Sequence, residues 1–238
     1  EIVEKLWLDI FLRRTLTAQL ERVFSTKPDK SKYVSISKKM AQIWGFSDVE
    51  IDAFRYFVCQ VRNEQHNPSL NKGLYIWSKK KQTGKTTIAK ALVAILNGET
   101  TVQAGGAYES NLQREMQMNA HDLPLATISN AIFLDEAMPK DTYKTYGRVK
   151  SLMTSNTCVV NPKYQKPRTV PARRNYIITS NDDMRDFVQD DSERRFVEIR
   201  MEREPKQMSD DEVFKIWLDF AQNCEPENST IDWYNTFE

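Results

Sequence analysis

The sequence predicts an α/β fold in which a mainly parallel, helix-covered sheet follows a small helical segment. Apolar residues recur at helical spacing over the first 66 residues, and short apolar runs typical of buried strands begin at Gly73. These runs then alternate with helical stretches, which favours a parallel sheet. With 40% hydrophobic and 28% charged residues, the 238-residue chain has a globular composition and enough length to bury a core.

Three helices are expected in residues 1–66, which we interpret as one helical module. Residues 2–24 carry an amphipathic pattern, and a second helix is expected over residues 37–44, ending at Gly45. Ser47 and Glu50 then form the pattern of a capping box that opens the third helix.

Residues 67–238 are expected to form the α/β domain, because the pattern changes at the Asn67-Pro68 break. The expected strands are Gly73–Trp77, Ala131–Leu134, Tyr176–Ile178 and Phe196–Ile199, and the expected helices are Thr86–Leu96, Pro139–Met153 and one that Ser209 and Glu212 cap.

A basic loop between the first expected strand and its helix has the order of a P-loop. The residues predicted to hold the phosphates of ATP are Lys81, Gln82, Thr83, Gly84, Lys85, Thr86 and Thr87. Lys85 is expected to reach the β and γ oxygens, and the Thr86 hydroxyl to bind Mg²⁺. Lys79 stands where the full pattern has its first glycine. The alternative interpretation is a basic loop that caps an ordinary helix.

Two further expected strands end in polar residues suited to ATP hydrolysis. Asp135 and Glu136 follow Leu134, so Asp135 is predicted to approach Mg²⁺ and Glu136 to activate the attacking water. Asn181 ends the next strand and is predicted to contact the γ-phosphate or that water. A solvated acidic turn and a turn-forming asparagine are the alternatives for each motif taken alone.

Basic residues dominate one stretch of a chain whose net charge is only +1. No acidic residue lies between Asp141 and Asp182, an asymmetry that favours a polyanionic partner such as DNA. Residues 157–160 and 169–170 are expected to pair as a β-hairpin with a basic tip. The residues predicted to contact nucleic acid are Lys163, Tyr164, Lys166 and Arg168. The alternative is a solvated basic turn.

The order of Lys85, Asp135-Glu136 and Thr179-Ser180-Asn181 resembles that of superfamily 3 helicases, and most of all the primase-helicases of phages, plasmids and genomic islands, including the virulence-associated E group. Asp191-Ser192-Glu193-Arg194-Arg195-Phe196 adds to the likeness. The resemblance covers about residues 70–200.

The resemblance implies an AAA+ type ATPase domain that assembles as a ring, usually a hexamer, with residues 1–66 as a helical collar. It also implies a replicative helicase that uses ATP and Mg²⁺ and whose hairpin tracks DNA through the channel. Arg194 or Arg195 would complete the ATP site of the neighbouring subunit; a salt bridge to Asp190 or Asp191 is the alternative role. A P-loop scaffold or replication initiator with little ATPase activity is the alternative function.

The remaining expectations concern the setting of the chain. No apolar stretch reaches the roughly 18 residues of a membrane span, so no membrane partner is expected. Three well-separated cysteines favour the reducing cytoplasm. The sequence begins at Glu1 without an initiator methionine, and we expect it to be a piece of a longer protein.

Overall fold

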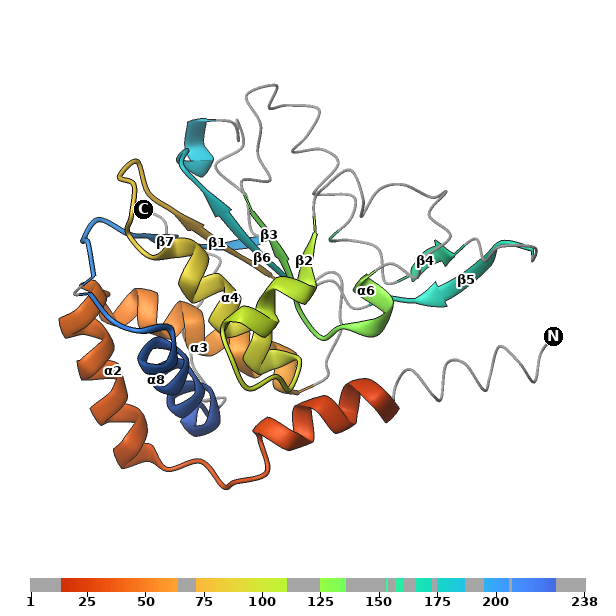
Figure 1. Cartoon of the computed structure of the whole chain (residues 1–238), viewed down its shortest axis with the longest axis horizontal. Helices are drawn as coiled ribbons and strands as arrows, with labels where there is room; N and C mark the ends of the chain where they lie inside the picture. Colours follow the sequence, from red (N-terminus) through yellow and green to blue (C-terminus); the bar gives the residue numbers. More distant parts are fainter. Residues whose placement is uncertain are drawn as a thin grey trace.

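The chain forms an α/β structure built on a five-stranded parallel sheet (Figure 1). A computed structural model describes residues 14–63, 72–110, 125–135, 153, 157–160, 166–172, 175–186, 195–205 and 207–225. Among these residues, no helix is long and apolar enough to cross a membrane.

The five strands are β1 (Gly73–Trp77), β2 (Glu109–Ser110), β3 (Ile132–Leu134), β6 (Tyr176–Ser180) and β7 (Phe196–Arg200). They lie in the order β2-β3-β6-β1-β7, and every neighbouring pair is parallel. The predicted strands of the α/β region are thereby confirmed, while the two-residue β2 was not foreseen.

This strand order brings three strand ends together. Because β6 lies between β1 and β3, the carboxyl ends of these three strands form one continuous edge. In parallel α/β sheets, ligands bind in the crevice outside this edge. The predicted motifs follow these same three strands.

Local capping explains where the first helices begin and end. Residues 14–23 are helical, α2 spans Lys30–Trp44 and α3 spans Asp48–Arg62. The capping box between Ser47 and Glu50 is confirmed at the start of α3. Gly45 ends α2 in the left-handed conformation, as expected, but α2 begins seven residues before the predicted Ser37 because the Asp29 side chain caps it.

Helices α4 (Lys85–Leu96) and α8 (Asp210–Asn223) lie with α2 and α3 on one side of the sheet (Figure 1). The predicted capping box of Ser209 and Glu212 is confirmed at α8. Shorter helical segments are η1 (Gln103–Tyr108), α6 (Leu125–Ile128) and η2 (Met184–Asp186). Of the predicted helix 139–153, only Met153 lies within the described residues.

The predicted hairpin strands are present as a separate antiparallel pair. β4 (Thr157–Val160) pairs with β5 (Arg168–Pro171), and the connecting residues 161–165 lie outside the described part of the chain. Figure 1 shows this pair beyond α6, at the end of the molecule away from α2.

One aromatic cluster joins the helices to each other. Trp217 of α8 is fully buried, with its ring centroid 4.7 Å from that of Phe54 and 5.7 Å from that of Trp44. The cluster continues through α4 to the sheet residues Leu74 and Ile76. The helices before residue 63 therefore share one core with the α/β part, while the predicted boundary at residue 66 lies outside the described residues.

A chain of buried amides holds the opposite, amino edge of the sheet, and we call it the amide network. Asn97 donates through Nδ2 to the Ala131 carbonyl at 2.9 Å and accepts from the Asn130 N–H at 2.7 Å. Asn130 in turn donates to the Leu16 carbonyl at 3.1 Å, and Asn175 donates to the Asn130 carbonyl at 2.8 Å. Strands β3 and β6 are thus bonded to α4 and to the first helix.

Candidate nucleotide-binding site

Residues 78–84 connect β1 to α4, and we call them the phosphate loop because the sequence predicts phosphate binding there. Ser78 starts the loop on the sheet, where its N–H donates to the Ser180 carbonyl at 3.2 Å, and its hydroxyl accepts from the Lys80 N–H at 3.0 Å. The loop then turns through two left-handed residues, Gln82 at φ 60° and Gly84 at φ 84°. Gly84 supplies a conformation that most L-residues avoid.

The missing first glycine does not distort this loop. Lys79 is exposed to solvent, so its side chain is not packed within the loop. Among the described residues, Gln82 is the only non-glycine with a positive φ, and Lys79 therefore has an ordinary backbone. Nothing in the local geometry requires glycine at position 79.

The amino end of α4 is suited to an anion. Its cap, Gly84, makes no side-chain hydrogen bond, and its first turn holds no acidic residue. The first-turn N–H groups have no acceptor within the helix, and the helix dipole is positive there. Phosphate groups bind at such ends. Beside it, the Thr83 hydroxyl is buried and has no hydrogen-bond partner among the described residues.

Lys85 extends from this helix end toward the sheet edge. Its Nζ donates to Asn181 Oδ1 at 3.2 Å and lies 3.4 Å from the Ser78 carbonyl oxygen and 3.5 Å from that of Lys80. The structure thus brings Lys85 and Asn181 together although 96 residues separate them. Their pairing places a cation and an amide over the loop.

Asp135 lies at the same carboxyl edge of the sheet. It directly follows β3, which is the neighbour of β6. Its carboxylate accepts a short hydrogen bond from the Thr179 hydroxyl, two residues before Asn181. Thr86, the other predicted Mg²⁺ ligand, is partly buried in the first turn of α4. No group of three or more His, Cys, Asp or Glu gathers as a metal cluster within the described residues, and Glu136 falls outside them. The Thr86 hydroxyl and the Asp135 carboxylate are oxygen donors, the kind of ligand that Mg²⁺ takes in proteins.

Arg195 lies at the amino ends of the parallel strands, on the side of the sheet opposite the phosphate loop. It directly precedes β7, and its carbonyl accepts from the Gly73 N–H at 2.7 Å, at the start of β1. Because β1 runs from this edge to the phosphate loop, Arg195 and Lys85 of one chain lie at opposite ends of that strand. Arg194 lies outside the described residues.

The sequence interpretation missed a fixed arginine in the loop after β6. The Asp183 carboxylate accepts from Arg185 Nη2 at 2.7 Å and Nε at 3.1 Å, and from the Arg185 N–H at 2.9 Å. The Arg185 guanidinium holds the pKa of the Asp183 carboxyl below its usual range, against burial, and Lys79 adds a smaller effect. The Asp183–Arg185 ion pair therefore lies beside the phosphate loop, in a segment whose other charged residues, Asp182 and Asp186, are acidic.

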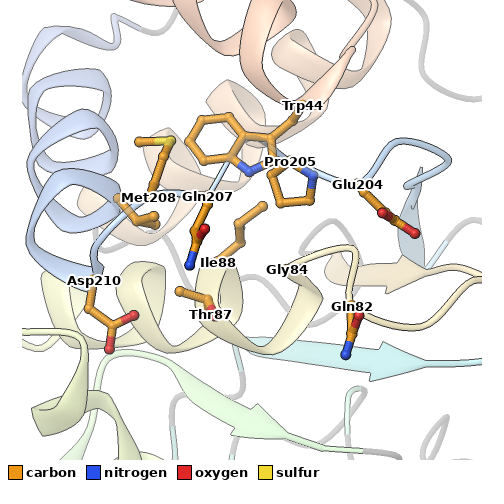
Figure 2. Close-up of a pocket in the computed structure, with 11 residues that line it drawn as sticks. Trp44, Gln82, Gly84, Thr87, Ile88, Glu204, Pro205, Gln207, Met208 and Asp210 are labelled. Atoms are coloured by element: carbon orange, nitrogen blue, oxygen red, sulfur yellow. The ribbon is translucent and has the colours of Figure 1, made fainter.

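A pocket of about 560 Å³ adjoins the phosphate loop (Figure 2). Its walls come from α2, the phosphate loop, α4, the segment after β7 and α8; the lining residues are Trp44, Gln82, Gly84, Thr87, Ile88, Glu204, Pro205, Gln207, Met208, Asp210 and Val213. In Figure 2, Trp44, Pro205 and Met208 lie on one side of the pocket and Gln82, Gly84 and Thr87 on the other. The lining is mixed, because Glu204, Gln207 and Asp210 add polar groups to an apolar side that Trp44, Pro205 and Met208 form. Small-molecule sites commonly combine apolar surface with polar groups that orient the ligand.

Most of this pocket could not be predicted from local sequence patterns. Gln82, Gly84 and Thr87 belong to the predicted loop, but Trp44 follows the pattern of an ordinary core residue. Only the packing of α2 against α8 brings Trp44 to the loop, through contacts between residues far apart in the chain.

The predicted nucleic-acid residues are described only in part. Lys166 is exposed just before β5, and Arg168 begins that strand with a partly buried side chain. Lys163 and Tyr164 lie outside the described residues, so their roles stay predictions.

Comparison with known proteins places about half of the chain in one family model. The model described as a family of unknown function (DUF5906) matches residues 76–195. These residues begin in β1 and end just before β7, so the match contains Lys85, Asp135 and Asn181. No curated protein matches this chain.

Two solved structures of the C-terminal region of NrS-1 are similar in fold. One is an A-form apo structure of its residues 305–718, with a TM-score of 0.55, and the other is described as an A-form apo structure of the same region, with a TM-score of 0.58. Each is 18% identical to this chain and covers 85% of it, whereas the chain spans 46% and 47% of theirs. At this identity the likeness concerns the fold alone.

Proposed function

The chain belongs to the family of unknown function DUF5906, and we propose that it is an ATP-hydrolysing motor that acts on DNA, as a ring-forming replicative helicase. The observation that supports this most is the meeting of Lys85 and Asn181 at 3.2 Å beside Asp135. A helix-end lysine, a strand-end carboxylate and a strand-end amide at one sheet edge are the parts that phosphoryl transfer from ATP needs.

In this proposal the nucleotide lies across the phosphate loop and the adjoining pocket. The amino end of α4 and Lys85 bind the triphosphate, and the pocket with Trp44 and Pro205 takes the base. Thr86 and Asp135 hold Mg²⁺, which neutralises charge on the phosphate oxygens when bound. Glu136 takes the proton of the attacking water, and Asn181 orients that water or the γ-phosphate.

The position of Arg195 supports assembly as a ring. Arg195 and Lys85 of one chain lie at opposite ends of β1, so in this proposal Arg195 contacts the phosphate loop of a neighbouring subunit and not its own. Arg194 or Arg195 then stabilises the charge that develops on the phosphate in the transition state. The β4–β5 pair, with Lys163, Tyr164, Lys166 and Arg168, would contact the DNA strand in the channel.

The second candidate is a nucleic-acid-binding P-loop scaffold or replication initiator with little or no ATP hydrolysis. The observation that favours it is the lysine at position 79, where the full P-loop pattern has glycine. Its exposed side chain and ordinary backbone weaken that alternative, because the loop closes without a glycine there. Replacing Lys79 with glycine should therefore leave nucleotide affinity within about threefold, well below the tenfold that 1.4 kcal/mol represents.

The test is steady-state ATP hydrolysis by the purified chain, with and without single-stranded DNA. Lys85→Met and Glu136→Gln are compared with Lys215→Met, which removes an exposed lysine of α8 far from the loop in sequence. Hydrolysis that rises with DNA and is lost in the first two variants, but not in the third, supports the motor. DNA binding without hydrolysis in the unaltered chain would replace the motor with the scaffold.

A further inference from the structure

Helix α2 presents a basic face that no part of the proposed site uses. Met40 and Trp44 are buried on its inner side, where the helix packs against α8 and α3. Lys30, Lys32 and Lys38 are exposed, as is Lys39. Figure 1 shows α2 at the edge of the molecule, at the end away from the β4–β5 pair.

The helical repeat sets these lysines in two rows. At about 100° per residue, Lys30 and Lys38 fall on one side of the exposed face and Lys32 and Lys39 on the other. The strip between the rows carries short or uncharged polar side chains, among them the exposed Ser35. A polyanion could therefore approach the helix closely along this strip, with ammonium groups on both sides.

The charge on this face is poorly compensated within the fold. No acidic residue occurs from Lys30 to Ser47, and Lys30 and Lys32 lie in the first turn, where the helix dipole disfavours cations. Lys32 has Asp29 nearby and Lys39 has Glu212. Among the described residues, no salt bridge within 4.0 Å involves Lys30 or Lys38.

We propose that this exposed face of α2 binds the phosphodiester backbone of a nucleic acid, as a contact separate from the β4–β5 pair. Rows of flexible lysines around small polar residues suit repeated phosphates, which are bound without reading sequence. A membrane surface fits less well, because an interfacial helix inserts its apolar face, and here that face is buried against α8 and α3. The inference requires no nucleotide at the phosphate loop.

The test measures binding of the whole chain to fluorescein-labelled oligonucleotides, single-stranded and duplex, by anisotropy without ATP over a range of salt concentrations. The variant Lys30→Gln with Lys38→Gln should bind more weakly. The slope of log Kd against log salt should fall by about 1.4 for single strands or 1.8 for duplex, since each lost phosphate contact removes about 0.7 or 0.9. The comparison of the two ligands identifies the form that is bound.

Two matched variants guard against indirect effects. Lys30→Arg with Lys38→Arg keeps the charge and should restore both affinity and slope, whereas Lys215→Gln removes a lysine from α8 and should change neither. Melting temperatures show whether each variant is folded.

An unchanged slope in the double glutamine variant overturns the proposal, as does an equal loss in Lys215→Gln. Loss of binding to anionic phospholipid vesicles, with oligonucleotide binding intact, would assign the face to a membrane instead. Loss of self-association alone, measured by sedimentation, would assign it to a neighbouring subunit. ATP hydrolysis failing in the unaltered chain would leave these results standing, so the two proposals can fail separately.

Discussion

Replacing Asn97 with leucine tests whether the amide network holds the sheet that carries the site. Asn97 is 1% exposed, and its side chain bonds two groups outside α4, the Asn130 N–H and the Ala131 carbonyl. Leucine has the same branching and number of side-chain heavy atoms but leaves both groups buried without that partner. Each such group costs about 1–3 kcal/mol, so the free energy of unfolding should fall by about 2–6 kcal/mol.

The assay is urea denaturation followed by circular dichroism and tryptophan fluorescence, with the slope m compared between variants. The control is Gln103→Leu, which removes an exposed amide whose Nε2 donates to Asp210 Oδ2 at 2.7 Å. Water replaces that bond, so the control should change stability by less than about 0.5 kcal/mol. If the free energy of unfolding of Asn97→Leu falls by less than about 1 kcal/mol, with m unchanged, the bonds of Asn97 to the Asn130 N–H and the Ala131 carbonyl do not stabilise the sheet as argued.

Three other outcomes are expected. Gly98→Ala should lower the melting temperature, because Gly98 has φ 78° and an added Cβ would lie 2.8 Å from the Gln19 carbonyl oxygen; an unaltered melting curve would show that the first helix does not rest there. Burial raises the pKa of the Glu198 carboxyl, so its protonated form is favoured in the fold and stability falls as pH rises through that pKa. Glu198→Gln should therefore raise the melting temperature at pH 8 but not at pH 4, while Glu202→Gln, an exposed control, should do so at neither. If the proposed function holds, Asn181→Leu should lower the kcat for ATP by about 100-fold or more while nucleotide Kd changes less than tenfold; equal losses in both would assign Asn181 to binding.

Much of the fold was predictable because its signals are local. Capping boxes at Ser47 and Ser209 and the left-handed Gly45 fix helix ends from a few neighbouring residues. Strand β1 and the first three residues of β6 are buried, and they therefore read as continuous apolar runs in the sequence. The early start of α2 was missed because its cap, Asp29, follows directly after Pro28 in a stretch without apolar periodicity.

The site was predictable only where residues follow strands. Lys85, Asp135 and Asn181 each come just after or near a strand end, so strand order alone brings them together. Pro205 and Met208 line the pocket because of tertiary packing, and tertiary packing produces no periodic pattern in the sequence from which they could be predicted. Arg185 was missed because its orientation depends on Asp183, two residues away, and not on a recognised motif.

The pocket beside the phosphate loop joins parts of the chain that are distant in sequence. Trp44, Ile88 and Met208 come from three separate segments, and all of them line the one cavity. A molecule bound there acts as a bridge between these segments, and it must leave before they can separate. Occupancy is therefore thermodynamically linked to folding: at a free concentration 100 times its Kd, a ligand adds about 2.7 kcal/mol to the free energy of unfolding. Thermal shift across a panel of nucleotides would thus rank ligands even in a variant that performs no chemistry.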